Sequence, residues 1–91
     1  MQNRIKIKLT IEERDLITNK TFADPVLLEP LKKGQVEDDL ITVYYPPQHL
    51  EELLGFIAAA ANHTGDKILE KVLDSLYDKL ADILDAYYES E

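Results

Sequence analysis

The chain contains no cysteine, and its three glycines, Gly34, Gly55 and Gly65, stand far apart. The lack of cysteine excludes disulfides, thiol nucleophiles and cysteine-based zinc sites, and it is typical of the reducing cytoplasm. Isolated glycines cannot build the glycine-rich loop with which many nucleotide-binding proteins hold phosphates. We therefore expect a cytoplasmic protein without a bound cofactor or metal.

Long apolar stretches are also missing. No run of 18 apolar residues occurs, and the N-terminal residues alternate charge with isoleucine instead of forming the apolar core of a signal peptide. We therefore expect neither a transmembrane segment nor a secretion signal.

Positive charge is scarce, because 10 lysines and arginines face 18 aspartates and glutamates, which gives a formal net charge of −8. Such a chain repels phosphate backbones and anionic lipid surfaces. The charge therefore disfavours direct binding of nucleic acid or of a membrane surface, and it favours a basic protein as the partner.

The length of 91 residues and the hydrophobic content of 45% predict one domain, residues 1–91, with a single core. Arg4–Leu9 alternates strictly between cations and apolar residues, which is the period of a half-buried strand. The three cations on one side keep such a strand soluble and unpaired; a nucleic-acid contact is the alternative. Thr10 with Glu13 three places later forms a capping-box pattern, which predicts a short helix over residues 11–19.

The middle of the chain predicts a hairpin. Val26–Leu31 is apolar enough for an edge strand, and Pro30 argues against the interior of a helix. Lys32–Gln35 supplies a turn, and Val36–Asp39 is expected to be loop. Leu40–Tyr45 is rich in β-branched and aromatic residues and is predicted to be the second strand of the hairpin.

Two helices are predicted at the C-terminal end. Apolar residues recur at helical spacing over 47–62, and Pro47 suits the first helical turn. The longest regular run is Asp66–Glu91, whose apolar residues alternate in steps of four and three. The polar connection between the two helices is short, which predicts an antiparallel helical hairpin. The fold class is therefore α+β: a small antiparallel sheet of about three strands, packed against a short N-terminal helix and a C-terminal αα-hairpin.

The residues that could carry catalysis are few. The only serines are Ser75, inside the long predicted helix, and Ser90, at its end, and neither is positioned as a nucleophile, so a hydrolase triad is not indicated. His49 and His63 lie near opposite ends of one predicted helix, too far apart to share a metal. His49 and Glu52 share a helical face, yet a di-iron bundle requires two such pairs, so a surface histidine is the simpler interpretation. We therefore predict that the protein is not an enzyme; a small enzyme or metal-dependent protein that uses Asp or Glu with a histidine is the alternative.

One charged pattern carries information. Asp66, Glu70, Asp74, Asp78 and Asp82 recur every four residues along the last helix. Like charges at this spacing repel each other by a few tenths of a kcal/mol per pair. The plainest interpretation is a solvated face; the sharper hypothesis is a surface that docks on a basic partner or imitates a nucleic-acid backbone.

The end of the last helix is unusually apolar. It extends beyond the length that the preceding helix can cover, and it carries Ile83, Leu84, Tyr87 and Tyr88. Either the sheet and first helix cover these side chains, or two copies pair through them as a homodimer. The hypothesis is thus a small regulatory or accessory protein, with predicted partner-binding residues Asp74, Asp78, Asp82, Ile83, Tyr87 and Tyr88.

Overall fold

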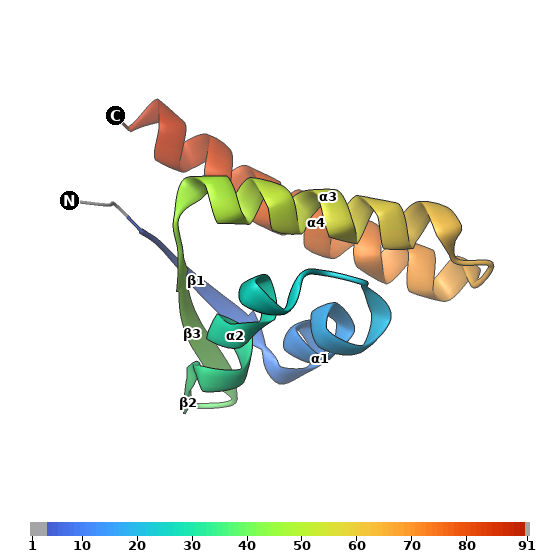
Figure 1. The fold of residues 1–91 in the computed structure, drawn as a ribbon, viewed down its shortest axis with the longest axis horizontal. Coiled ribbons are helices and arrows are strands. Elements are labelled where there is room, and N and C mark those ends of the chain that lie inside the picture. The colour runs from blue at the N-terminus through green and yellow to red at the C-terminus, as the bar shows by residue number, and fades with distance from the viewer. Residues whose placement is uncertain (1–3, 91) are drawn as a thin grey trace.

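The computed structural model describes residues 4–90. They form a three-stranded antiparallel sheet and four helices, with the helices gathered on one face of the sheet (Figure 1). This confirms the predicted α+β class, with one short helix more than expected. The bounds are β1 Ile5–Thr10, α1 Ile11–Lys20, α2 Pro25–Lys33, β2 Gln35–Glu37, β3 Leu40–Tyr45, α3 Pro47–His63 and α4 Lys67–Glu89.

The sheet has the order β1-β3-β2, so β3 is its central strand. β1 pairs with all of β3, from Ile5 opposite Tyr45 to Thr10 opposite Leu40. The strict alternation in β1 buries one set of side chains and exposes the cations of the other set. The buried face of the two long strands consists of Ile5, Ile7, Leu9, Ile41, Val43 and Tyr45.

The first helix begins as its sequence predicts. The Thr10 side chain accepts a hydrogen bond from the backbone N–H of Glu13, and the Glu13 carboxylate accepts one from the backbone N–H of Thr10. This reciprocal capping box satisfies two amides that a helix start leaves free. The predicted end at residue 19 is one residue short of the observed end, Lys20.

The prediction of an edge strand over Val26–Leu31 is wrong, because this segment belongs to α2. The Asp24 side chain caps the helix by accepting from the backbone N–H of Val26, and Pro25 occupies the first turn, where its missing N–H costs nothing. Leu27 and Leu31 then enter the core together, four residues apart. Pro30 removes only one internal hydrogen bond, to the carbonyl of Val26, which borders an open cleft that water can enter.

The expectation that Val36–Asp39 is loop is also wrong in part. The strand that pairs with β3 in the hairpin is β2, Gln35–Glu37, and the connection is only Asp38 and Asp39. Both aspartates have positive φ, 53° and 65°. Two-residue hairpin loops need this left-handed conformation, which aspartate tolerates better than most residues.

The helical hairpin matches the prediction closely. α3 ends one residue later than predicted, and α4 begins after Asp66, whose side chain accepts from the N–H groups of Ile68 and Leu69. Glu91, the predicted end of the long helix, lies outside the described residues. Leu73, Leu76, Leu80 and Leu84 of α4 are buried against Leu50, Leu53, Leu54 and Ile57 of α3 and the rest of the core. Among the helices of residues 4–90, none combines the length and apolar character that crossing a membrane requires.

Gly34 joins α2 to β2 and has a φ of −59°, so it is not needed for an unusual backbone conformation. A Cβ atom at this position would overlap the Ile41 side chain and lie 2.9 Å from Val43 Cγ1. Both neighbours are buried and β-branched, so neither can swing aside. The absence of a side chain therefore lets the hairpin start close against β3.

We predict that Gly34→Ala destabilises the fold by about 1–3 kcal/mol, because the added methyl group overpacks the core. Gly55 is the matched control: it lies inside α3 with nothing within 4 Å of a Cβ atom, so Gly55→Ala should stabilise by about 0.5–1 kcal/mol. Urea unfolding measures both changes. Equal midpoints for the two variants would contradict the close approach at Gly34.

Candidate functional site

The predicted acidic row is only partly a surface of α4, because Asp66 precedes the helix and caps it and Glu70 is half-buried. The exposed part of the row is an acidic stripe on the outer side of α4. Asp74, Asp78 and Asp82 are all exposed. Successive members turn by about 40° around the helix, so they form a shallow stripe. Asp85 and Glu89 continue the same stripe and are exposed as well.

The carboxylates of this stripe are not neutralised. Within residues 4–90, the ion pairs within 4.0 Å join Arg14 to Asp15, Lys33 to Glu29 and Lys79 to Glu13. None of them includes a member of the acidic stripe. Lys79, which lies between Asp78 and Asp82 in the sequence, points to α1 instead, where its Nζ is 2.7 Å from Glu13 Oε1.

Glu13 is the point where α1 and α4 are tied together. Its Oε1 accepts from the Thr10 backbone N–H at 2.8 Å and from Lys79 Nζ. Burial raises the pKa of the Glu13 carboxyl, but the hydrogen bonds from Lys79 and Thr10 and the charge of Lys79 together outweigh it, so the pKa lies below its usual 4.5. The ionised carboxylate is therefore part of the folded structure.

The apolar residues at the end of α4 occupy other sides of the helix. Leu84 is buried, and Ile83 and Tyr87 are partly buried against the core. Tyr88 is 46% exposed, and its hydroxyl is 3.1 Å from Glu51 Oε1 in the first turns of α3. Tyr88 also packs edge-on against Tyr87, with ring centroids 5.6 Å apart. The chain thus covers much of this end itself.

The six residues predicted as a partner surface therefore fall into two groups. Asp74, Asp78 and Asp82 face outward together, whereas Ile83 and Tyr87 contact the core. Tyr88 lies on the flank of α4 that faces α3. The acidic group is a surface by itself, and only Tyr88 of the apolar group presents a large exposed area.

The two histidines border different hollows. His49 lies at the start of α3 and lines a cleft of about 700 Å³, and His63 lines a second cleft of about 230 Å³. Within residues 4–90, no three histidine, aspartate or glutamate side chains are placed so that they could hold a metal ion.

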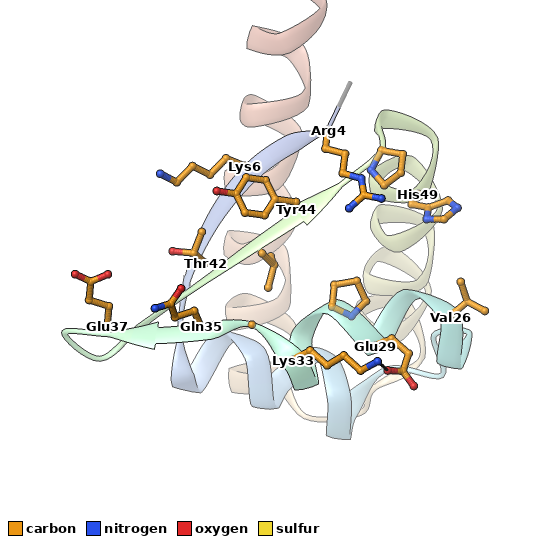
Figure 2. A pocket seen from close by; sticks show the side chains of 14 residues that line it. Arg4, Lys6, Val26, Glu29, Lys33, Gln35, Glu37, Thr42, Tyr44 and His49 are labelled. Carbon is orange, nitrogen blue, oxygen red and sulfur yellow. Dashed lines mark ion pairs between the residues drawn. The ribbon is translucent and has the colours of Figure 1, made fainter. Parts of the chain in front are cut away.

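The larger cleft lies at the edge of the sheet beside β3, between β3, α2 and the start of α3, and sequence reasoning did not identify it (Figure 2). Its lining includes the cations Arg4, Lys6 and Lys33, the acids Glu29 and Glu37, and the rings of Tyr44 and His49. The alternating cations of β1 were a visible signal in the sequence. The opposite wall gave no such signal, because it is formed by α2, and this segment was predicted to be a strand.

The smaller cleft lies between the α1–α2 connection and α3. Phe22, Phe56, Ala59 and Ala60 give it apolar walls, and Lys20, His63 and Thr64 complete its lining. Phe22 is 95% exposed, so its ring stands out beside the cleft and does not fill it. Single exposed apolar side chains such as Phe22 are common on protein surfaces.

Comparisons with protein-family models, with curated proteins and with solved structures find no match for this chain. The interpretation of the acidic stripe and of the two clefts therefore depends on their own geometry and chemistry.

The tie between α1 and α4 gives a pH-dependent prediction. Because folding lowers the pKa of Glu13, its contribution is present above the unfolded pKa of about 4.5 and is lost as the pH falls through the folded pKa. Glu13→Gln should cost about 1 kcal/mol at pH 7 and should flatten the loss of stability between about pH 5 and pH 3. Urea unfolding at several pH values measures this.

Glu12→Gln is the control. Glu12 is exposed and directly precedes Glu13, and its substitution removes the same single negative charge. It should keep the acid dependence of the wild type. If Glu13→Gln and Glu12→Gln show the same pH dependence, the Lys79 contact does not hold the pKa of Glu13 down.

Proposed function

We propose that this protein is a small cytoplasmic interaction or regulatory protein whose acidic stripe on α4 binds a basic surface of another protein. The observation that supports the proposal is the absence of neutralisation: within the described chain, Asp74, Asp78 and Asp82 have no cation within ion-pair distance, and the nearby Lys79 is directed to Glu13.

The energetics favour a role for the stripe beyond solubility. Aspartates at i and i+4 repel each other by a few tenths of a kcal/mol per pair, so the stripe is slightly unfavourable for the isolated helix. A basic partner surface removes this repulsion and gains attraction. Complementary charges also accelerate encounter and make the complex sensitive to salt.

The support beneath the stripe is rigid. Leu73, Leu76 and Leu80 on the opposite side of α4 are buried, and they fix the orientation of the helix. The carboxylates are therefore presented at a fixed spacing by a regular element, which lowers the entropy lost on binding. The absence of cysteine accords with the proposed cytoplasmic location.

The test is the triple variant Asp74→Asn, Asp78→Asn, Asp82→Asn. We expect it to lose capture of its partners from a cell lysate, while its stability stays equal or rises by less than about 1 kcal/mol. Affinity purification with mass spectrometry measures capture, and urea unfolding measures stability.

A matched control changes the same charge elsewhere, with Asp38→Asn, Asp39→Asn and Glu52→Gln. Asparagine tolerates the positive φ of the hairpin turn, and Glu52 is exposed on α3. This control should retain capture. Equal capture by both triple variants and the wild type would show that the stripe is only a solvated face.

The exposed ring of Tyr88 favours a second candidate, a homodimer through the end of α4. We expect such a dimer to dissociate in Tyr88→Ser but to persist in Tyr44→Ser, a control of similar exposure on the sheet, 49% against 46%. Sedimentation equilibrium measures this. A wild-type mass of 10.4 kDa at high micromolar concentration would rule out the dimer.

A further inference from the structure

The open face of the sheet carries a positive charge that the net charge of the chain conceals. Residues 4–33 contain seven cations and five acids, whereas residues 34–91 contain three cations and thirteen acids. Lys6 and Lys8 lie on the exposed face of β1, and Arg4, which directly precedes the strand, continues the same alternation and is exposed. On this face Lys6 lies opposite Tyr44 of β3, and Lys8 lies opposite Thr42.

The central strand is also left without a partner along half of one edge. β2 pairs only with the first half of β3, and its last pair joins Gln35 to Thr42. Because the hairpin loop has two residues, Glu37 and Leu40 form the hydrogen-bonded pair that closes it. Backbone groups of alternate residues point to the same side, so Leu40, Thr42 and Tyr44 all point toward the β2 side.

Tyr44 lies beyond the end of β2, so its backbone N–H and C=O point to that side without a strand to receive them. Within residues 4–90, no turn, cap or side-chain hydrogen bond uses these two groups. An unpaired strand edge of this kind is a template for another extended segment.

The cleft of about 700 Å³ lies at this open edge. Figure 2 shows Arg4 and Tyr44 on one side of the space, Lys33 and Glu29 of α2 on the other, and His49 at the end near α3. Lys33 pairs with Glu29 at 3.4 Å, but both side chains are largely exposed, so this ion pair is weak and can exchange partners. A volume of this size is ample for several residues of an extended peptide.

We propose that this cleft binds an extended acidic peptide segment of a partner protein, which pairs with the backbone of Tyr44 and places its carboxylates near Arg4, Lys6 and Lys33. Side chains of an extended peptide alternate between two faces. A segment with an acidic residue at every second position therefore directs all its carboxylates to the cationic face of the sheet.

Charge decides between this occupant and two others. A second copy that docked on the same edge would bring Arg4, Lys6 and Lys33 against their own equivalents, and like charges at an interface repel. Nucleic acid would meet the cations locally, but the overall charge of −8 opposes its approach. A peptide is small enough to meet only the local cationic face, and unlike nucleic acid it can pair with both open backbone groups of Tyr44.

The probe for this proposal is a capped hexapeptide in which glutamate and valine alternate. Titration into the ¹⁵N-labelled protein should shift the backbone amide signal of Tyr44 and those of neighbouring residues in the cleft. The double variant Arg4→Glu, Lys6→Glu should weaken the binding about tenfold, because two attractive contacts become repulsive. Lys71→Glu, which makes the same kind of change on exposed α4, should leave the binding within about twofold.

A second version of the probe tests the backbone contact without changing the protein. Methylation of the central backbone nitrogens of the hexapeptide keeps its charge but removes hydrogen-bond donors, and it should weaken binding about fivefold. The proposal does not depend on the acidic stripe, so the Asp74, Asp78 and Asp82 triple variant should bind the peptide as the wild type does.

Four outcomes would overturn the proposal. The first is no shift at Tyr44 with millimolar peptide. The second is equal binding of a peptide with lysine in place of glutamate. The third is tighter binding of a short single-stranded oligonucleotide that also requires Lys6, which would identify a nucleic-acid face. The fourth is self-association that Tyr44→Ser abolishes, which would identify a second copy as the occupant.

Discussion

Burial of one face of β3 is the constraint on which the rest of the fold depends. Ile41, Val43 and Tyr45 of the central strand are all at most 2% exposed. A sheet of three strands with a single apolar face needs cover on that face only, so all four helices pack there. Tyr45 also reaches α2, since its buried hydroxyl donates to the carbonyl of Leu27, and burial raises the pKa of this tyrosine. The central strand β3 thus also holds α2 in place, the helix that was not predicted from the sequence.

The same constraint separates the charges. Because apolar residues of β1 must alternate with polar ones, its cations are left on the open face of the sheet. On α4, Lys79 reaches α1 on one flank and Tyr88 reaches α3 on the other, with the buried leucines between them. The aspartates are left on the remaining side, which faces away from the sheet. A net charge of −8 therefore averages over two surfaces of opposite sign.

Much of the fold could be predicted because several segments have an unbroken period. The alternation in β1, the capping box at Thr10 and the repeat of α4 are local signals that the packing reinforces. The prediction for the segment of α2 was wrong because it gave too much weight to Pro30. It gave too little to the four-residue spacing of Leu27 and Leu31 and to the capping ability of Asp24. One missing hydrogen bond in a short helix costs less than the burial of two leucines contributes.

Of the two candidate surfaces, one could be predicted from the sequence and the other could not. Exposure of the acidic stripe could be predicted because a helix with one apolar face must expose the other. The cleft could not, since it requires α2 to lie beside β3 and β2 to end after three residues, and both depend on contacts between segments distant in the sequence. The sequence showed the cations of β1 but not the open edge next to them.

The two surfaces are independent in composition but joined through the core. No residue belongs to both surfaces, because the stripe is made by α4 and the cleft lining contains no residue of α4. β1 contributes its cations to one surface and ends at Thr10, whose backbone N–H donates to the same Glu13 oxygen as Lys79 of α4. Lys79 could have neutralised the stripe from its place between Asp78 and Asp82. Because Lys79 pairs with Glu13, it does not neutralise Asp78 or Asp82. The same contact therefore ties α1 to α4 and leaves the negative charge of the stripe that a basic partner would meet.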